Sequence, residues 1–161
     1  MSDSKPTRRK FIKAAATSTA AGVAASTMPA PSFGYHNSVN DTLRVGLIGC
    51  GGRGTQAVIN ALRADEQTEV SALADAFEDR IEICHKGLTK NKVAKDRMNV
   101  PRERWFSGFD CYKQLIDSNV DVVLLASPPY FRPTQLRYAI EAGKHVFCEK
   151  PVAVDLSLIH I

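Results

Sequence analysis

The chain has 161 residues, 44% of them hydrophobic and 24% charged, and a formal net charge of +4 at pH 7. This composition is typical of a globular protein and excludes a wholly disordered chain. The whole positive excess lies in residues 1–13, while residues 41–161 sum to zero, so the charge gives no support to nucleic-acid binding by the folded part. No apolar run reaches the roughly 18 residues of a membrane span, so we expect no stable membrane anchor.

The first 33 residues have the three regions of an export signal. Residues 7–13 read TRRKFIK, an Ala-rich stretch covers 14–25, and small residues with prolines follow. This order is typical of a signal peptide, and the paired Arg8 and Arg9 resemble the twin-arginine (Tat) signal. We therefore expect residues 1–33 to hold a Tat signal and the start of a linker, and residues 34–42 to form a polar lead-in. Export through the twin-arginine route, to the periplasm, follows; the alternative is a disordered basic tail.

From residue 43 onward, short apolar runs alternate with helical patterns. The pattern predicts strands over 43–48, 69–74, around 105–106, over 120–126 and over 145–148. Helices are predicted over 54–64, 77–90, 109–118 and 134–142, the last one ended by Gly143. This alternation predicts an α/β fold, a doubly wound parallel sheet covered by helices on both faces, known as a Rossmann fold.

Cysteine usage indicates no metal centre and no disulfide framework. The four cysteines show neither a C-x-x-C pair nor a Cys/His ligand spacing; they are Cys50, Cys84, Cys111 and Cys148. We expect them to be small, mostly buried apolar side chains.

The segment 49–54 reads Gly-Cys-Gly-Gly-Arg-Gly, which is G-x-G-x-x-G between a predicted strand and a predicted helix. In such a turn the first glycine permits the tight bend, the second lets a pyrophosphate approach, and the third allows close helix–strand packing. The helix N-terminus then offers free N–H groups to the phosphates. The predicted cofactor-binding residues of this turn are Gly49, Gly51, Gly52, Arg53 and Gly54.

An acidic residue ends the second predicted strand. Asp75 lies 21 residues after Gly54, where a carboxylate can accept the hydroxyls of the adenosine ribose. A carboxylate would repel a 2′-phosphate, so NAD is favoured over NADP, and the nearby Arg80 keeps NADP open. The alternative is a glycine turn that binds no nucleotide.

Two further runs carry a family resemblance. Residues 126–130 read ASPPY after the fourth predicted strand, and residues 141–151 read EAGKHVFCEKP. With these runs, residues 43–155 resemble the nucleotide-binding half of the glucose–fructose oxidoreductase / inositol dehydrogenase (Gfo/Idh/MocA) family. The resemblance implies an NAD(P)-binding Rossmann domain over 43–155.

The resemblance also implies site residues. Lys150 is the expected catalytic lysine, which reaches the substrate hydroxyl beside the nicotinamide, and Glu149 shapes its turn. The turn formed by Ser127, Pro128 and Pro129 is expected to flank the nicotinamide side of the cofactor. A lysine at the carboxyl end of a parallel strand lies at the edge of the sheet where ligands bind. The alternative for Lys150 is a solvated surface lysine.

Members of this family carry a second α/β domain, which forms the substrate pocket, and the resemblance does not extend to it here. Residues 156–161 do not continue the family pattern, and we interpret them as a foreign tail on a gene fragment. We expect the chain alone to be inactive and the full-length protein to be a homo-oligomer.

Three functions remain compatible with these residues. The first is an NAD(P)-dependent oxidoreductase that transfers a hydride between a nicotinamide and a sugar, polyol or derivative. The second is a redox-neutral glycosidase that uses NAD on the same fold. The third is a non-catalytic nucleotide-binding protein, against which the intact Lys150 argues.

Overall fold

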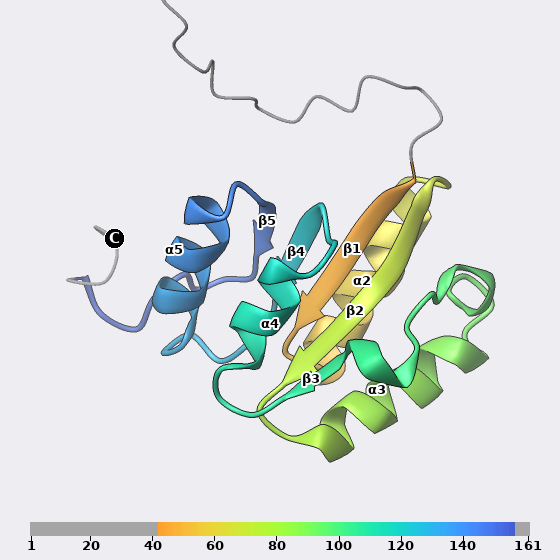
Figure 1. The fold of residues 1–161 in the computed structure, drawn as a ribbon, viewed down its shortest axis with the longest axis horizontal. Helices are drawn as coiled ribbons and strands as arrows, with labels where there is room; N and C mark the ends of the chain where they lie inside the picture. The colour runs from red at the N-terminus through yellow and green to blue at the C-terminus, as the bar shows by residue number, and fades with distance from the viewer. Residues whose placement is uncertain (1–41, 157–161) are drawn as a thin grey trace, which may run out of the picture. The chain divides into compact units, whose positions relative to one another are not determined.

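A computed structural model describes residues 42–156 of the chain. These residues form a parallel sheet with helices on both faces (Figure 1). The predicted Tat signal and most of the polar lead-in lie outside the described residues, as do residues 157–161 of the predicted foreign tail. Among the described residues, no helix has the length and apolar character that crossing a bilayer requires.

The sheet has five strands, all paired in parallel, in the order β3-β2-β1-β4-β5. They are β1 (Leu43–Ile48), β2 (Thr68–Asp75), β3 (Trp105–Ser107), β4 (Val122–Leu125) and β5 (His145–Cys148). The chain moves outward from β1 to β3, then returns to the other side of β1 to add β4 and β5. The strand order therefore reverses between β1 and β4, and in open α/β sheets ligands bind at the carboxyl ends of the strands around such a reversal.

Two apolar cores cover the two faces of this sheet. The helices are α2 (Gly52–Ala64), α3 (Glu78–Lys90), α4 (Cys111–Asp117) and α5 (Arg132–Glu141). Residues of α2 and α3 pack with Val45 and Leu47 of β1, whereas residues of α4 and α5 pack with Ile48 from the other face. Figure 1 shows α4 in front of the sheet and α2 behind it. The predicted doubly wound fold is confirmed.

The helix α5 ends as its sequence predicts. Gly143 has φ +69°, its N–H donates to the carbonyl of Ile140, and the N–H of Lys144 donates to the carbonyl of Ala139. These two bonds are the Schellman arrangement, in which a glycine in the left-handed region satisfies the last carbonyls of a helix. The turn directs the chain into β5, so the segment that carries Lys150 begins from a defined point.

The predicted elements are all present, and the differences lie at their ends. The helix α2 begins at Gly52 and not at residue 54, because Gly51 already serves as its N-cap. The strand β4 is shorter than predicted: the N–H of Val120 donates to Ser118 and not to a neighbouring strand. Two short 3₁₀ helices, at Lys95–Arg97 and Arg102–Arg104, were not predicted.

The cysteines are free thiols, three of them buried and Cys148 half-buried, as predicted. Within residues 42–156, no group of three or more His, Cys, Asp or Glu side chains gathers where it could hold a metal ion.

Candidate functional site

Two glycines of the turn after β1 lie so close to other backbone atoms that neither position has room for a side chain. Gly49 has φ +96°, and a Cβ there would lie 2.6 Å from the backbone nitrogen of Ser127. A Cβ on Gly54 would lie 1.9 Å from the carbonyl oxygen of Gly49. Both positions therefore require glycine, the first for its backbone conformation and the close approach of the turn after β4, the second for packing of α2 on the turn.

The second glycine of the motif meets a different environment. Gly51 has extended backbone, with φ −73° and ψ −178°, and a Cβ there would have no atom within 4 Å. The helix α2 begins next to it, with no side-chain cap and no acidic residue in its first turn. Its first N–H groups and the positive end of its dipole are thus available to an anion. Open space beside unpaired donors is what a bound pyrophosphate requires.

Asp75 stands at the carboxyl end of β2, and the backbone orients its carboxylate. Asp75 accepts hydrogen bonds from the N–H of Cys50, at 2.7 Å, and from the N–H of Phe77, at 3.1 Å. The first bond ties the acid to the glycine turn, 25 residues earlier in the chain. The spacing between the glycine motif and Asp75, from which we predicted a ribose-binding acid, therefore corresponds to a direct contact between the glycine turn and the end of β2.

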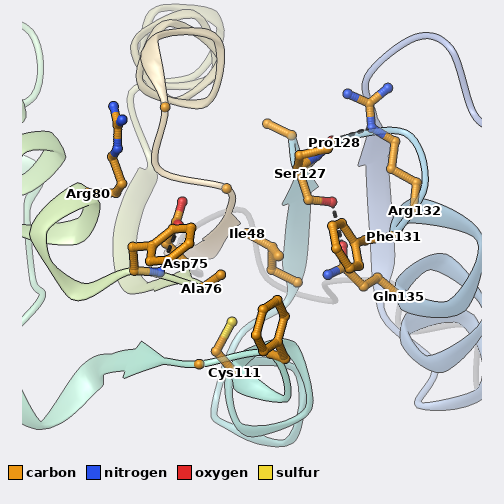
Figure 2. A pocket seen from close by; sticks show the side chains of 16 residues that line it. Ile48, Asp75, Ala76, Arg80, Cys111, Ser127, Pro128, Phe131, Arg132 and Gln135 are labelled. Atoms are coloured by element: carbon orange, nitrogen blue, oxygen red, sulfur yellow. Dashed lines mark hydrogen bonds between the residues drawn. The ribbon is translucent and has the colours of Figure 1, made fainter.

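A cavity of about 600 Å³ lies across the carboxyl edge of the sheet. Figure 2 shows Asp75 and Arg80 on one side of it, Ser127, Arg132 and Gln135 on the other, and Ile48 between them. Small-molecule sites typically have volumes of roughly 300–1,000 Å³, so this cavity is large enough for a cofactor-sized ligand.

The predicted residues divide into two groups by position. Five of them line the cavity: Gly49, Gly51, Asp75, Ser127 and Pro128. The other six do not line it: Gly52, Arg53, Gly54, Pro129, Glu149 and Lys150. The structure thus brings the three predicted nucleotide-contacting segments together around one space, and places the predicted catalytic lysine outside its lining.

Apart from Arg80, sequence reasoning assigned no role to the other residues of the wall. Phe109 and Cys111 come from the segment after β3, and Phe131, Arg132 and Gln135 come from the segment after β4. Nothing in the local pattern distinguishes these side chains from ordinary helix or loop residues. Their position after parallel strands was the only available signal, since such segments meet at one edge of the sheet.

Cys111 is a poor nucleophile at this site. Burial raises the pKa of its thiol to about 11, so it stays protonated at neutral pH. The Ser127 hydroxyl on the opposite wall donates a hydrogen bond to the side-chain oxygen of Gln135. Neither the protonated thiol of Cys111 nor the hydrogen-bonded hydroxyl of Ser127 is therefore suited to act as a nucleophile.

Glu149, which precedes Lys150 in the segment after β5, is held by an ion pair with a residue of α2. Its side chain is only 6% exposed and forms an ion pair with Arg53 at 2.8 Å, across 96 residues of sequence. The hydrogen bond from Arg53 lowers the pKa of the Glu149 carboxyl below its ordinary value. The first turn of α2 is thus tied to the segment after β5, and Lys150, next in the chain, is exposed.

Comparisons with known proteins also indicate an NAD-binding Rossmann domain. Residues 43–160 match the family model for Gfo/Idh/MocA, described as an oxidoreductase family with an NAD-binding Rossmann fold. The chain is 35% identical over 121 residues to "Glycosyl hydrolase family 109 protein 1" of Bacteroides fragilis, covering 74% of this chain and 24% of that protein. It is 32% identical over 115 residues to a myo-inositol 2-dehydrogenase of Thermotoga maritima, covering 71% and 30%.

A solved structure has the same fold. The scyllo-inositol dehydrogenase of Lactobacillus casei, with bound NAD(H) and scyllo-inositol, aligns with a TM-score of 0.56 and 22% identity, over 74% of this chain and 31% of that one. The chain therefore spans between about a quarter and a third of the length of these known proteins.

Proposed function

The chain belongs to the Gfo/Idh/MocA oxidoreductase family and its folded part is an NAD-binding Rossmann domain, and from this premise we propose that the whole protein transfers a hydride between NAD(P) and a sugar, polyol or derivative. One observation carries the proposal: the glycine turn, the acid after β2 and the turn after β4 border a single cavity at the strand reversal. The bound nicotinamide would supply the hydride chemistry, and the protein would bind, orient and handle the proton.

Each bordering segment has a proposed part in holding the cofactor. The N–H groups at the start of α2, beside Gly51, would bind the pyrophosphate, and Asp75 would accept the adenosine ribose hydroxyls. Ser127 and Pro128, with the adjoining Pro129, would border the nicotinamide. Asp75 favours NAD, and Arg80 on the same wall is the side chain that could receive a 2′-phosphate of NADP.

We assign the proton transfer to Lys150. It follows the buried Glu149 after β5, at the carboxyl edge of the sheet, and its own side chain is exposed. An exposed amino group beside the ligand edge can reach a hydroxyl on a substrate that lies above the cofactor. As the neutral amine, Lys150 would take up the proton of that hydroxyl during oxidation, and as the resulting ammonium it would return the proton during reduction.

Replacing Gly51 with valine tests the cofactor site without damaging the fold. Because the Cβ position of Gly51 is open and its backbone is extended, Gly51→Val should fold, while its side chain occupies the pyrophosphate space. We expect its affinity for NAD, measured by calorimetry, to fall by about tenfold or more. Unchanged affinity in a folded variant would refute the site. Activity is tested separately with the purified full-length protein and a panel of polyols and sugars, by formation of reduced nicotinamide.

The second candidate function is the redox-neutral glycosidase. It is favoured by the 35% identity to a relative named as a family 109 glycosyl hydrolase. In such an enzyme, oxidation of the sugar at C3 acidifies the neighbouring C–H and permits loss of the leaving group before the sugar is reduced again. Release of an aglycone without accumulation of reduced nicotinamide would identify this function, whereas reduced nicotinamide formed from a free sugar would identify the dehydrogenase.

We further propose that the protein is exported to the periplasm through the twin-arginine route and acts there as a homo-oligomer. The support for export is the sequence of residues 7–33, with Arg8 and Arg9 before a mildly apolar stretch.

A further inference from the structure

Arg132 is a charged side chain buried in the wall of the cavity. It is the first residue of α5 and only 5% exposed. Removing a guanidinium from water costs free energy unless hydrogen bonds replace those it made with solvent. The partners that Arg132 finds are therefore informative about its role.

Its hydrogen bonds join two separate turns. The Nε atom donates to the carbonyl of Ser127, at 2.6 Å, in the turn after β4. The Nη1 atom donates to the carbonyls of Glu149 and Pro151, each at 2.6 Å, in the segment after β5. Figure 2 shows the bond from Arg132 to Ser127 at the upper end of the cavity wall.

The two carbonyls in the second turn belong to the residues immediately before and after Lys150. A single guanidinium thus fixes the backbone on both sides of that lysine, 17 and 19 residues further along the chain. The side chain of Glu149 is held independently by Arg53 from α2. The backbone of Lys150 is therefore restrained from two helices while its own side chain is exposed.

We propose that Arg132 is a positioning residue for Lys150: it holds the lysine-bearing turn in register with the nicotinamide-bordering turn at Ser127. This inference rests on the proposed function. Arg132 acts here through backbone carbonyls, and the planar fork of the guanidinium lets it reach both turns at once. A lysine would keep the charge but place its donors on one nitrogen.

The experiment uses the full 161-residue chain with three variants. Arg132→Gln removes the charge and most of the donors, and Arg132→Lys keeps the charge without the fork. Arg137→Gln, on the exposed face of the same helix, is the matched control. Circular dichroism establishes that each variant is folded, and Arg132→Lys serves in place of Arg132→Gln if the latter does not fold.

The first readout is hydrogen exchange of the backbone around Lys150, which reports whether the turn is held. We expect the N–H groups of Glu149, Lys150 and Val152 to exchange about tenfold faster or more in both Arg132 variants, and to be unchanged in Arg137→Gln. The readout needs neither cofactor nor activity.

The second readout is acetylation of Lys150 by acetic anhydride, with and without saturating NAD, measured by peptide mass spectrometry. We expect NAD to slow the labelling of Lys150 by about fivefold or more in the wild type and in Arg137→Gln, with the exposed Lys90 as an internal reference. In the Arg132 variants, each labelled at an NAD concentration that saturates that variant, this protection should fall below about twofold. A residue that merely stabilised the fold would leave the protection intact in folded protein.

Each outcome decides the inference. Faster exchange together with lost protection supports it. Wild-type exchange or wild-type protection in the Arg132 variants overturns it while leaving the proposed function standing. If NAD binds the wild type but gives Lys150 no protection, Lys150 does not lie beside the nicotinamide, and its proposed role and this inference both fail. If NAD does not bind, the proposed function itself fails, and the inference with it.

Discussion

The glycine turn after β1 can close only if position 54 carries no side chain. The Cβ of an alanine at position 54 would lie 1.9 Å from the carbonyl oxygen of Gly49, and a backbone atom cannot move aside as a flexible side chain can. We expect Gly54→Ala to lower the free energy of unfolding by about 3 kcal/mol or more, measured by urea denaturation.

Gly87 provides the matched control for this substitution. It lies within α3, is exposed, and has no atom within 4 Å of its Cβ position. Gly87→Ala should therefore raise stability by about 0.5–1 kcal/mol, because alanine favours the helix and restricts the unfolded chain. Equal effects of the two substitutions would contradict the packing role of Gly54.

The ion pair between Arg53 and Glu149 makes stability depend on pH. Its hydrogen bond lowers the pKa of the Glu149 carboxyl in the folded state, so the folded protein binds this proton less readily than the unfolded chain does. The contribution is therefore complete above the unfolded pKa of about 4.5 and is lost as the pH falls through the lowered folded value.

Substitution of Arg53 should show this dependence. We expect Arg53→Gln to be less stable than the wild type at pH 7, and the difference to shrink steadily as the pH falls below about 4.5, measured by thermal unfolding at several pH values. Arg63→Gln, at the exposed end of the same helix, should show no such trend. A stability difference that is constant from neutral to acid pH would rule out the ion pair as its source.

At the scale of elements, the end of α5 determines where the lysine-bearing segment begins. Gly143 has φ +69°, and a Cβ there would meet nothing within 4 Å, so only the backbone conformation penalises a side chain. We expect Gly143→Ala to cost about 1 kcal/mol in chemical denaturation. Gly143→Asn should cost less, because asparagine tolerates the left-handed region better. A cost that grew with side-chain size would instead indicate crowding.

At the scale of the whole molecule, the proposed export depends on two residues. Replacing Arg8 and Arg9 with lysine keeps the charge of the leader, so a change in location would report recognition of the arginine pair and not electrostatics. We expect this double variant to remain in the cytoplasm of a host that has the twin-arginine pathway, as measured by cell fractionation. Lys5→Arg, outside the pair, is the control and should be exported; equal export of both variants would refute the assignment.

Export would also constrain how the cofactor is held. The periplasm offers no pool of nicotinamide to refill an empty site, so a protein folded before export must keep its cofactor. Retention for many minutes needs a dissociation rate below about 10⁻³ s⁻¹ and, with association near 10⁶ M⁻¹s⁻¹, a Kd of about 1 nM or tighter.

We therefore expect the exported full-length protein to be purified with nicotinamide bound, detected by mass spectrometry after denaturation. A cofactor that never leaves must be restored within the same site, which favours a paired oxidation and reduction or the redox-neutral glycosidase. Protein that is purified without nicotinamide and turns over only with added cofactor would contradict the prediction that the cofactor is retained and restored within the site.

Much of the fold follows from local pattern. β1 and β5 begin and end at the predicted residues, because each is a short apolar run bounded by turn signals. The short 3₁₀ helix at Lys95–Arg97 was missed, because its pattern is polar and carries no periodic signal. Both the glycine motif and Asp75 were recognisable because their spacing along the chain reflects a repeated strand–turn–helix geometry.

The sequence by itself therefore determined the order of the strands and helices, the glycine turn, the acid after β2 and the family to which the chain belongs. Only the tertiary structure decided what surrounds them: that Arg53 pairs with Glu149, that Arg132 is buried and joins the turn after β4 to the segment after β5, and that Lys150 lies outside the lining of the cavity. The physical reason is distance along the chain. Periodicity and capping act over a few residues, whereas these contacts join turns that meet only after the parallel strands have aligned their carboxyl ends.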